Sequence, residues 1–593
     1  MHENIILNFS LIILLGISAQ WLGWKLRVPS ILLLLLFGFL AGPITNILDP
    51  DHLFSDLLFP IVSLAVGLIL FEGGLSLKFS QIKEIHRAVL NLISIGALIT
   101  WILSSCAAYW ILELGPSLSL LLGAILVVTG PTVIIPLLRH IRPTQRISSV
   151  ARWEGIVIDP IGATLSVLIF GALLIEGWRE ATDYALLGFF KTIVLGIGVG
   201  GIAALLVVLL LRFYWIPDFL HTSFTLMIVV VSFAISNHLQ EESGLLTVTV
   251  MGIILANQKK ANVHHIVVFK ETLTVLLISS LFILLAARMK LSDLVHIDVN
   301  AFLFVLCILF IIRPLAVFSS TWRTRLNFKE RIFLAWLAPR GIIAAAVASI
   351  FSLKLEQLGF EKADKIVPIT FFVIVATVVI YGLTAKPLAN LLHLTDPNPQ
   401  GLLIMGAHWW CRDLAKKLQS LGLQVDLIDR NLQKIFKARS RGISAWHTNA
   451  VKEDPEHIEL SGIGSFLAMT GNDEANSLAC LNYQEVFGRE NVYQLVARRE
   501  DNSGAGRHLR GRILFSKEAT FEYLDQSFKS GATIKATQLS TEFDHEDYQK
   551  HYGSSTIILF VVRKNGNIQM TLGEEEFRPS PGQTLISLVN PLS

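Results

Sequence analysis

Residues 153–163 read WEGIVIDPIGA, and they place Glu154 and Asp159 inside an apolar run that extends from about 147 to 174. A run of this length is long enough to cross a bilayer as one helix. A charged carboxylate near the centre of such a helix costs about 2.5 to 3.5 kcal/mol on insertion scales, so it normally faces a cavity, a partner or an ion. Asp159 is therefore the first candidate for a functional residue. Pro160 beside it frees a backbone carbonyl that a cation could use.

The composition of the whole chain indicates a membrane protein. Of its 593 residues, 53% are hydrophobic and only 16% are charged, and the mean hydropathy is +0.58. Soluble domains carry roughly a quarter of charged residues. The formal net charge of +3 excludes a polybasic surface for nucleic acid. The four cysteines show no metal-ligand spacing, so no resident metal is expected.

Apolar runs repeat along the first two thirds of the chain and predict thirteen membrane spans. Lysines and arginines gather in alternate loops, which predicts an outside N-terminus and a cytoplasmic C-terminus and requires an odd number of spans. The predicted spans are roughly 4–23, 28–43, 56–77, 87–112, 117–138, 147–175, 184–211, 218–238, 243–257, 267–287, 299–320, 329–351 and 366–392.

Two of these spans are interrupted near their middle. Gly130 and Pro131 interrupt the fifth span, and Pro339 and Gly341 interrupt the twelfth. The two are the fifth members of two six-span sets, spans 1 to 6 and 8 to 13, and broken helices at matching positions predict an inverted-repeat transporter with its site at the midplane. Thr129 offers a hydroxyl beside the carbonyls that such a break releases.

Arg340, in the twelfth span, needs a buried partner because a guanidinium cannot usefully lose its proton. Glu154 is the predicted partner, so Glu154 is expected to form an ion pair near the site. Asp159 then remains as the carboxylate that is free to titrate. A proton and a monovalent cation would compete for it, and each transit would carry one or the other.

The chain after the last span has the texture of a soluble protein. We predict a membrane domain over 1–393, an α/β Rossmann-like domain over 400–520 and a small strand-rich domain over 535–593. A Pro-bearing linker at 394–400 separates the first two. The second begins with a strand, helix, strand pattern, and the third contains an Asn-Gly turn signal at Asn565 and Gly566.

The motifs VTGPTVIIPLLR, RWEGIVIDPIGA and APRGIIAAAVAS together resemble the bacterial sodium (or potassium)/proton antiporters of the monovalent cation:proton antiporter superfamily, in the NhaP-like branch. The resemblance covers nearly all of residues 1–392. It implies a 13-helix inverted-repeat fold with two crossing broken helices, a homodimer in the bacterial inner membrane, and an elevator-like movement. It also implies that Asp159 carries the proton and the cation, that Thr129 is a ligand, and that Glu154 and Arg340 form a polar pair beside them.

Two positions depart from that family's pattern. Typical members have Asn before the essential Asp, where this chain has Ile158, and Asp in the broken helix, where this chain has Gly130. The two polar groups that would face each other are therefore missing together. The absence of a second acid beside Asp159 favours electroneutral, one-for-one exchange.

The cytosolic tail resembles the RCK-type (TrkA-N-like) regulators of potassium channels and transporters, whose core is a Rossmann-like nucleotide-binding fold. The glycine-rich turn would fall at residues 406–411, where only Gly406 of the three glycines survives. Asp429 stands where an acid would hold a ribose, and Thr470 and Asn472 also match the pattern. A smaller adenine nucleotide or a structural dimerisation role fits this turn better than a dinucleotide.

Three functions are compatible with the sequence. The first is a secondary antiporter that exchanges Na⁺ or K⁺ for H⁺ and is controlled by its cytosolic domain. The second is a potassium efflux system or channel-like path gated by that domain, and proton coupling separates the two. The third, a membrane-anchored oxidoreductase, is disfavoured by the damaged glycine turn, so the chain is not expected to be an enzyme.

Overall fold

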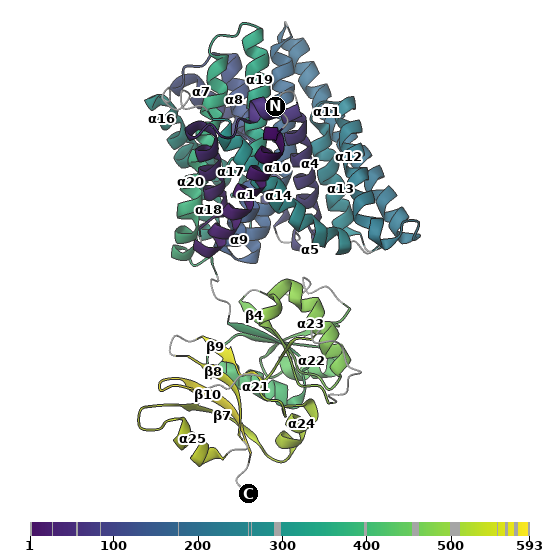
Figure 1. Cartoon of the computed structure of the whole chain (residues 1–593), viewed down its shortest axis with the longest axis vertical. Helices are drawn as coiled ribbons and strands as arrows, with labels where there is room; N and C mark the ends of the chain where they lie inside the picture. The colour runs from purple at the N-terminus through teal and green to yellow at the C-terminus, as the bar shows by residue number, and fades with distance from the viewer. Residues whose placement is uncertain are drawn as a thin grey trace. The chain divides into compact units, whose positions relative to one another are not determined.

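The structure is a computed structural model of the chain, which divides into two compact units, Met1–Thr395 and Asp396–Ser593 (Figure 1). Most of the predicted linker at 394–400, and Asn565 and Gly566, lie outside the described residues. The structure describes residues 3–26, 28–54, 57–82, 85–175, 177–258, 260–261, 264–289, 298–395, 400–452, 460, 462–498, 510–553, 556–563, 567–573 and 579–590.

The first unit is a bundle of apolar helices (Figure 1). Among its described residues, eight helices are long and apolar enough to cross a membrane, and five shorter apolar helices accompany them. The main helices are α1 (Glu3–Leu26), α2 (Ser30–Phe39), α4 (Leu58–Leu75), α6 (His86–Asn91), α7 (Ala97–Ile111), α8 (Pro116–Ile125), α9 (Pro131–Ile141), α10 (Gln145–Leu173), α11 (Trp178–Arg212), α12 (His221–Leu239), α13 (Ser243–Asn257), α14 (His264–Ala287), α16 (Val299–Cys307), α17 (Arg313–Thr321), α18 (Phe328–Trp336), α19 (Ile342–Gln357) and α20 (Ile366–Leu391).

Short elements connect or extend these helices. The π-helical turn Leu40–Ile44 extends α2, Leu92–Gly96 joins α6 to α7, and Ile308–Ile312 joins α16 to α17. The helices α3 (Pro50–Phe54) and α5 (Phe79–Ile82) and the 3₁₀ turns Asp218–Leu220 and Ala363–Lys365 lie between longer helices. Apolar side chains such as Leu187, Val194 and Ile202 of α11 are more than half exposed, as lipid-facing residues are. The first unit therefore has the structure of a multi-pass membrane protein.

Two pairs of helices are separated by short non-helical segments. The first segment lies between Ile125, where α8 ends, and Pro131, where α9 begins; proline suits this first position because its missing N–H needs no partner there. The second lies between Trp336 of α18 and Ile342 of α19. The two segments touch, because a Cβ on Gly130 would lie 2.6 Å from the Cα of Gly341. Only glycine fits such an approach.

The second unit begins with a six-stranded parallel sheet of order β3-β2-β1-β4-β5-β6, which is the doubly wound order of dinucleotide-binding folds. Helices α21 (Trp409–Ser420), α22 (Leu432–Arg439) and α23 (Asp473–Phe487) follow β1, β2 and β4 in the chain. The strands are β1 (Gly401–Met405), β2 (Val425–Asp429), β3 (Ser444–His447), β4 (Ile463–Ala468), β5 (Val492–Gln494) and β6 (Arg512–Ile513).

A four-stranded antiparallel sheet of order β7-β10-β8-β9 completes the second unit. One apolar cluster contains Leu402 of the first sheet, Leu414 of α21 and Leu588 of the second sheet, so α21 lies between the two sheets (Figure 1). The remaining elements are α24 (Phe521–Lys529), β7 (Thr533–Gln538), α25 (His545–Tyr552), β8 (Ile557–Val562), β9 (Ile568–Met570) and β10 (Thr584–Val589).

Candidate functional site

Asp159 lies on the face of α10 that packs against the first non-helical segment. A Cβ on Gly155 would lie 2.6 Å from Cδ1 of Ile134 in α9, and one on Gly162 would lie 2.6 Å from Cγ2 of Val128. Residues four and three apart share one helix face, so Asp159 lies between these two contacts on the same face. The small glycines thus bring the carboxylate against the break between α8 and α9.

Several buried side-chain oxygens beside this break have no hydrogen-bond partner among the described residues. Asp159 is only 1% exposed, and neither of its carboxylate oxygens has a hydrogen-bond partner among the described residues. The hydroxyls of Thr129 and Thr132 are also buried without a partner there. A buried carboxylate cannot persist as a bare anion, so it must bind a proton or a cation. Oxygen atoms of this kind are suitable ligands for either.

Glu154 pairs with Arg313, not with Arg340 as the sequence predicted. Nη1 of Arg313 donates to Oε1 of Glu154 at 2.5 Å, and Nη2 donates to Oε2 at 3.0 Å. Five residues on an α-helix turn through about 500°, so Glu154 projects from α10 roughly 140° away from Asp159. The prediction of the pair was therefore wrong in its partner. Arg313 donates to both carboxylate oxygens of Glu154, and the role of Glu154 as a cation ligand stays a prediction.

Arg313 is a residue that the sequence reasoning missed. It is 6% exposed at the start of α17, inside the predicted eleventh span. Its guanidinium also donates to the carbonyls of Leu334 and Leu337, at the C-terminal end of α18. The available signal was an arginine within an apolar run, which is rare and needs a buried partner.

Arg340 lies at the other break. It is 1% exposed, its Nη1 donates to the carbonyl of Val127 at 3.4 Å, and its backbone N–H donates to Oγ1 of Thr377 at 3.3 Å. Val127 is two residues past Ile125, the last residue of α8, so Arg340 lies near the C-terminal end of that half-helix. The two arginines therefore each place a positive charge at the negative end of an interrupted helix, Arg313 at α18 and Arg340 at α8.

The two departures from the antiporter pattern have structural reasons. Ile158 is 3% exposed and packs in an apolar cluster with Ala97 and Val127, so this position holds a van der Waals contact and no polar group. Gly130 touches the backbone of Gly341, so any side chain at this position would displace the second break. Neither position therefore presents a polar side chain at the break.

The residues predicted to bind a nucleotide in the second unit have other partners. Gly406 has a φ of 116°, as a tight turn after β1 requires. Asp429 accepts a hydrogen bond from the backbone N–H of Ala407 at 2.9 Å and lies 3.5 Å from Nζ of Lys434. Thr470 donates to Asn476 at 2.6 Å, and the Asn472 side chain caps α23 by accepting from the backbone of Ala475.

The start of α21, where a pyrophosphate would lie, is filled by aromatic side chains. Trp410 is 1% exposed and stacks on Phe528 of α24 with ring centroids 5.5 Å apart, and His408 lies 4.9 Å from the ring of Phe521. Burial and the charge of Lys434 lower the pKa of His408 to about 4, so its ring is neutral near pH 7. The residues present do not fit a dinucleotide.

The second unit matches the TrkA-N domain family over residues 402–509. This match and the six-stranded parallel sheet agree with the predicted RCK-type tail.

The first unit resembles known antiporters. The chain is 27% identical over 397 residues to the probable Na(+)/H(+) antiporter 2 of Methanocaldococcus jannaschii. That alignment covers 62% of this chain and 92% of the relative. It is 27% identical over 402 residues to the K(+)/H(+) antiporter NhaP of Alkalimonas amylolytica, which covers 67% of this chain and 68% of that protein.

A solved structure shares the fold. The sodium proton antiporter MjNhaP1 from Methanocaldococcus jannaschii superposes with a TM-score of 0.56 at 24% identity, over 65% of this chain and 98% of that one. The family of sodium/hydrogen exchanger transmembrane domains matches residues 9–391, which is more than half of the chain. The chain therefore belongs to the sodium/hydrogen exchanger family, with a TrkA-N domain after its membrane unit.

Proposed function

We propose that this protein exchanges a monovalent cation, Na⁺ or K⁺, for a proton across the membrane, and that Asp159 binds both in turn. The observation that supports this most directly is the carboxylate of Asp159, which is buried beside the break between α8 and α9 without a hydrogen-bond donor among the described residues. The family supports it too, since relatives are named Na(+)/H(+) and K(+)/H(+) antiporters.

The exchange follows from competition at one charge. When Asp159 is ionised, its oxygens and the Thr129 hydroxyl bind the cation, with the Thr132 hydroxyl as a further ligand. When Asp159 is protonated, the buried site is neutral and needs no cation. Each direction of transit then carries either one cation or one proton, so the exchange is electroneutral. An empty, ionised site would be a bare buried anion, and its cost opposes uncoupled movement.

Arg313 and Arg340 hold the two breaks in place in this proposal. Arg313 links Glu154 of α10 to the end of α18, and Arg340 reaches the end of α8. Both positive charges are therefore directed at carbonyls and at Glu154, so that Asp159 stays available to the transported ion. The N-terminal ends of α9 and α19 meet at the same crossing and favour an anionic group there.

The full architecture is part of the proposal. Four joins among the described helices would give thirteen spans: α6 with α7, α8 with α9, α16 with α17, and α18 with α19. One non-helical segment would then lie in the fifth span of each inverted repeat. We expect the breaks to cross at Gly130 and Gly341 and the protein to act as a homodimer with an elevator-like movement. The N-terminus would lie outside a bacterial inner membrane and the TrkA-N domain in the cytoplasm.

The cytosolic unit would regulate transport without a dinucleotide. Its parallel sheet keeps the regulatory fold, but His408 and Trp410 fill the phosphate-binding turn and Asp429 bonds to that turn. The proposal divides the chain into a membrane domain (1–393), a Rossmann-like domain (400–520) and a strand-rich domain (535–593). The membrane domain would carry the ion, and the other two would regulate it.

The test is dissipation of a pH gradient in proteoliposomes when Na⁺ or K⁺ is added. We expect the native protein to move protons and Asp159→Asn to lose at least 90% of that activity, since an amide cannot exchange a proton. Asp218→Asn is the matched control, because Asp218 is exposed in the turn before α12 and should leave activity unchanged. Cation flux without proton movement in the native protein would instead favour a potassium efflux path gated by the cytosolic unit.

A further inference from the structure

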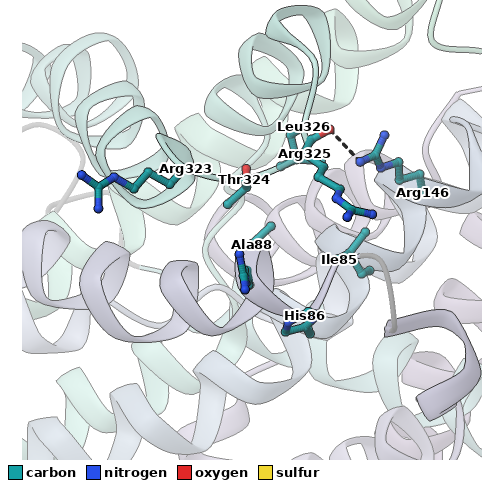
Figure 2. A pocket seen from close by; sticks show the side chains of 9 residues that line it. Ile85, His86, Ala88, Arg146, Arg323, Thr324, Arg325 and Leu326 are labelled. Atoms are coloured by element: carbon teal, nitrogen blue, oxygen red, sulfur yellow. Dashed lines mark hydrogen bonds between the residues drawn. The ribbon is translucent and has the colours of Figure 1, made fainter.

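A second polar feature of the membrane unit is a pocket whose lining does not include Asp159. The pocket has a volume of about 180 Å³ and is lined by nine residues, none of them acidic. Five of these carry the basic groups: His86, Arg87, Arg146, Arg323 and Arg325. In Figure 2 the guanidinium groups of Arg146 and Arg325 lie near each other, whereas the side chain of Arg323 extends away from them.

Three separate segments bring these cations together. His86 and Arg87 open the membrane helix His86–Ile111, Arg146 is in the first turn of α10, and the segment from Arg323 to Leu326 precedes α18. The pocket is therefore at the ends of membrane helices, which is the depth of lipid headgroups. Helix N-termini also present unpaired N–H groups that favour an anion.

The backbone acceptors that would repel an anion are already in use. Nη2 of Arg146 donates to the carbonyl of Arg325 at 2.7 Å, as the dashed line in Figure 2 marks. Arg331 donates to the carbonyls of Leu326 and Thr324 at 3.1 and 3.2 Å. These bonds fix the segment before α18 and leave its carbonyls satisfied, so the pocket offers mainly donors.

Among the described residues, the carboxylate of Glu330 lies beside Arg146 and does not neutralise the cluster. Glu330 is 6% exposed, accepts the backbone N–H of Asn327 at 2.7 Å and lies 3.8 Å from Nη1 of Arg146. It serves as the cap of α18 and offsets one of the four guanidinium groups. The side chains of Arg87 and Arg325 are exposed.

A bland explanation is that these arginines only set the membrane orientation. Orientation requires only positive residues in the loops of one side, such as Lys25 and Arg212 in the last turns of α1 and α11. It does not require residues from three segments to line one concavity. Like charges held together favour a bound anion, and arginine matches the oxygens of phosphate in two bonds at once.

We propose that this pocket binds a phosphate group, which either the headgroup of an anionic phospholipid or a soluble phosphate would supply. The bound group would bridge the start of α6, the start of α10 and the segment before α18. Because α10 carries Asp159 and α18 ends at the second break, occupation of the pocket would stabilise the elements that hold the ion site. The proposal does not depend on which cation is transported.

The experiment measures the melting temperature of the full-length protein in a mild neutral detergent. The probes are short-chain phosphatidylglycerol, short-chain phosphatidylcholine, and inorganic phosphate or pyrophosphate at fixed ionic strength. The variant is Arg87→Gln with Arg325→Gln, two exposed side chains whose removal keeps the bond from Arg146 to the Arg325 carbonyl. The matched control is Lys25→Gln with Arg212→Gln, which removes two positive charges elsewhere.

We expect an anionic probe to raise the melting temperature of the native and control proteins. In the variant with Arg87→Gln and Arg325→Gln, the shift should be at most half as large. A shift with phosphatidylglycerol alone identifies a lipid headgroup, and an equal shift with phosphate or pyrophosphate identifies a soluble ligand. The proposal is overturned if no anionic probe shifts the native protein, if phosphatidylcholine acts equally, or if the variant keeps the full shift. Failure here would leave proton coupling at Asp159 untouched, because the assays are independent.

Discussion

The backbone of Gly130 lies against the backbone of Gly341, so that a Cβ on either residue would lie within about 2.6 Å of the other residue's Cα. This contact joins the break between α8 and α9 to the break between α18 and α19. It lies beside the first non-helical segment, against which the Asp159 face of α10 packs. The geometry of the proposed ion site would therefore depend on residues that carry no charge.

A methyl group at this contact should disturb the site. We expect Gly341→Ala to destabilise the protein by about 1 to 3 kcal/mol, the cost of overpacking, and to reduce exchange. Gly198→Ala is the matched control, because a Cβ there meets no atom within 4 Å in the middle of α11 and alanine favours the helix. Melting temperature and exchange rate in proteoliposomes measure both effects. Equal behaviour of the two variants would contradict the close contact.

The partner of Glu154 can be tested by double substitution. Glu154→Gln leaves Arg313 buried without its carboxylate, which should cost about 3 to 5 kcal/mol. Adding Arg313→Gln should recover part of that loss, because the uncompensated charge is gone. Adding Arg340→Gln should show a clearly smaller coupling. Melting temperatures of the three single and two double variants measure the two couplings. A larger coupling of Glu154 with Arg340 than with Arg313 would contradict the pairing in the structure.

The hydroxyl of Thr129 should contribute to cation binding and little to folding. We expect Thr129→Val to raise the KM for the cation by about tenfold, equivalent to about 1.4 kcal/mol, with a smaller change in maximal rate. Thr249→Val in α13 is the control, since the Thr249 hydroxyl already donates to the carbonyl of Leu245 in its own helix. An unchanged KM in the Thr129 variant would remove this residue from the ligand set.

The neutral His408 should make the cytosolic unit sensitive to acid. Its pKa is about 4 in the folded chain against about 6.5 when unfolded, so the unfolded state binds the proton first as the pH falls. The stability is complete above about pH 6.5 and should fall by up to about 1.4 kcal/mol per pH unit between pH 6.5 and pH 4. Hydrogen exchange of residues 409–420 in the full-length protein reports this loss. His408→Gln should flatten the profile, and an unchanged profile would exclude His408.

The aromatic residues around the start of α21 should differ in how much they contribute to stability. Trp410→Ala should cost about 3 to 5 kcal/mol because Trp410 is fully buried against Phe528. Trp409→Ala should cost less, since Trp409 is 38% exposed and contacts Phe528 only through its edge. The native full-length protein should not bind NAD or NADP in a binding assay, and neither should the two variants. Tight binding of either nucleotide by the native chain would contradict the filled turn.

The sequence was informative where hydrophobic length and helix breakers decide the structure. Proline at position 131 marked the start of α9 and the pair at 339 and 341 marked the second break, because both effects are local to the backbone. The family resemblance and the antiporter class were confirmed by the matched family. Asp159 as the ion-binding residue remains a prediction.

The pairing of buried charges could not be deduced from the sequence. Arg340 and Arg313 were equally able to neutralise Glu154 in principle, and the choice depends on the rotation of α10 and on where α17 packs. Arg313 lies in the eleventh predicted span, outside the two interrupted spans, so the sequence did not point to it as the partner of Glu154. Similarly, the basic pocket needs three segments that are far apart in the chain to meet, the starts of α6 and α10 and the residues before α18, and only the fold shows that they do.

Release of protons on cation binding tests the central claim most directly. The full-length protein in weakly buffered detergent solution, near the pH at which exchange is half-maximal, is titrated with NaCl or KCl, and choline chloride corrects for ionic strength. We predict release of a fraction of one proton per site that rises toward about one as the pH is lowered, and none from Asp159→Asn. Saturable cation binding without proton release at any pH in the transport range would contradict competition at Asp159.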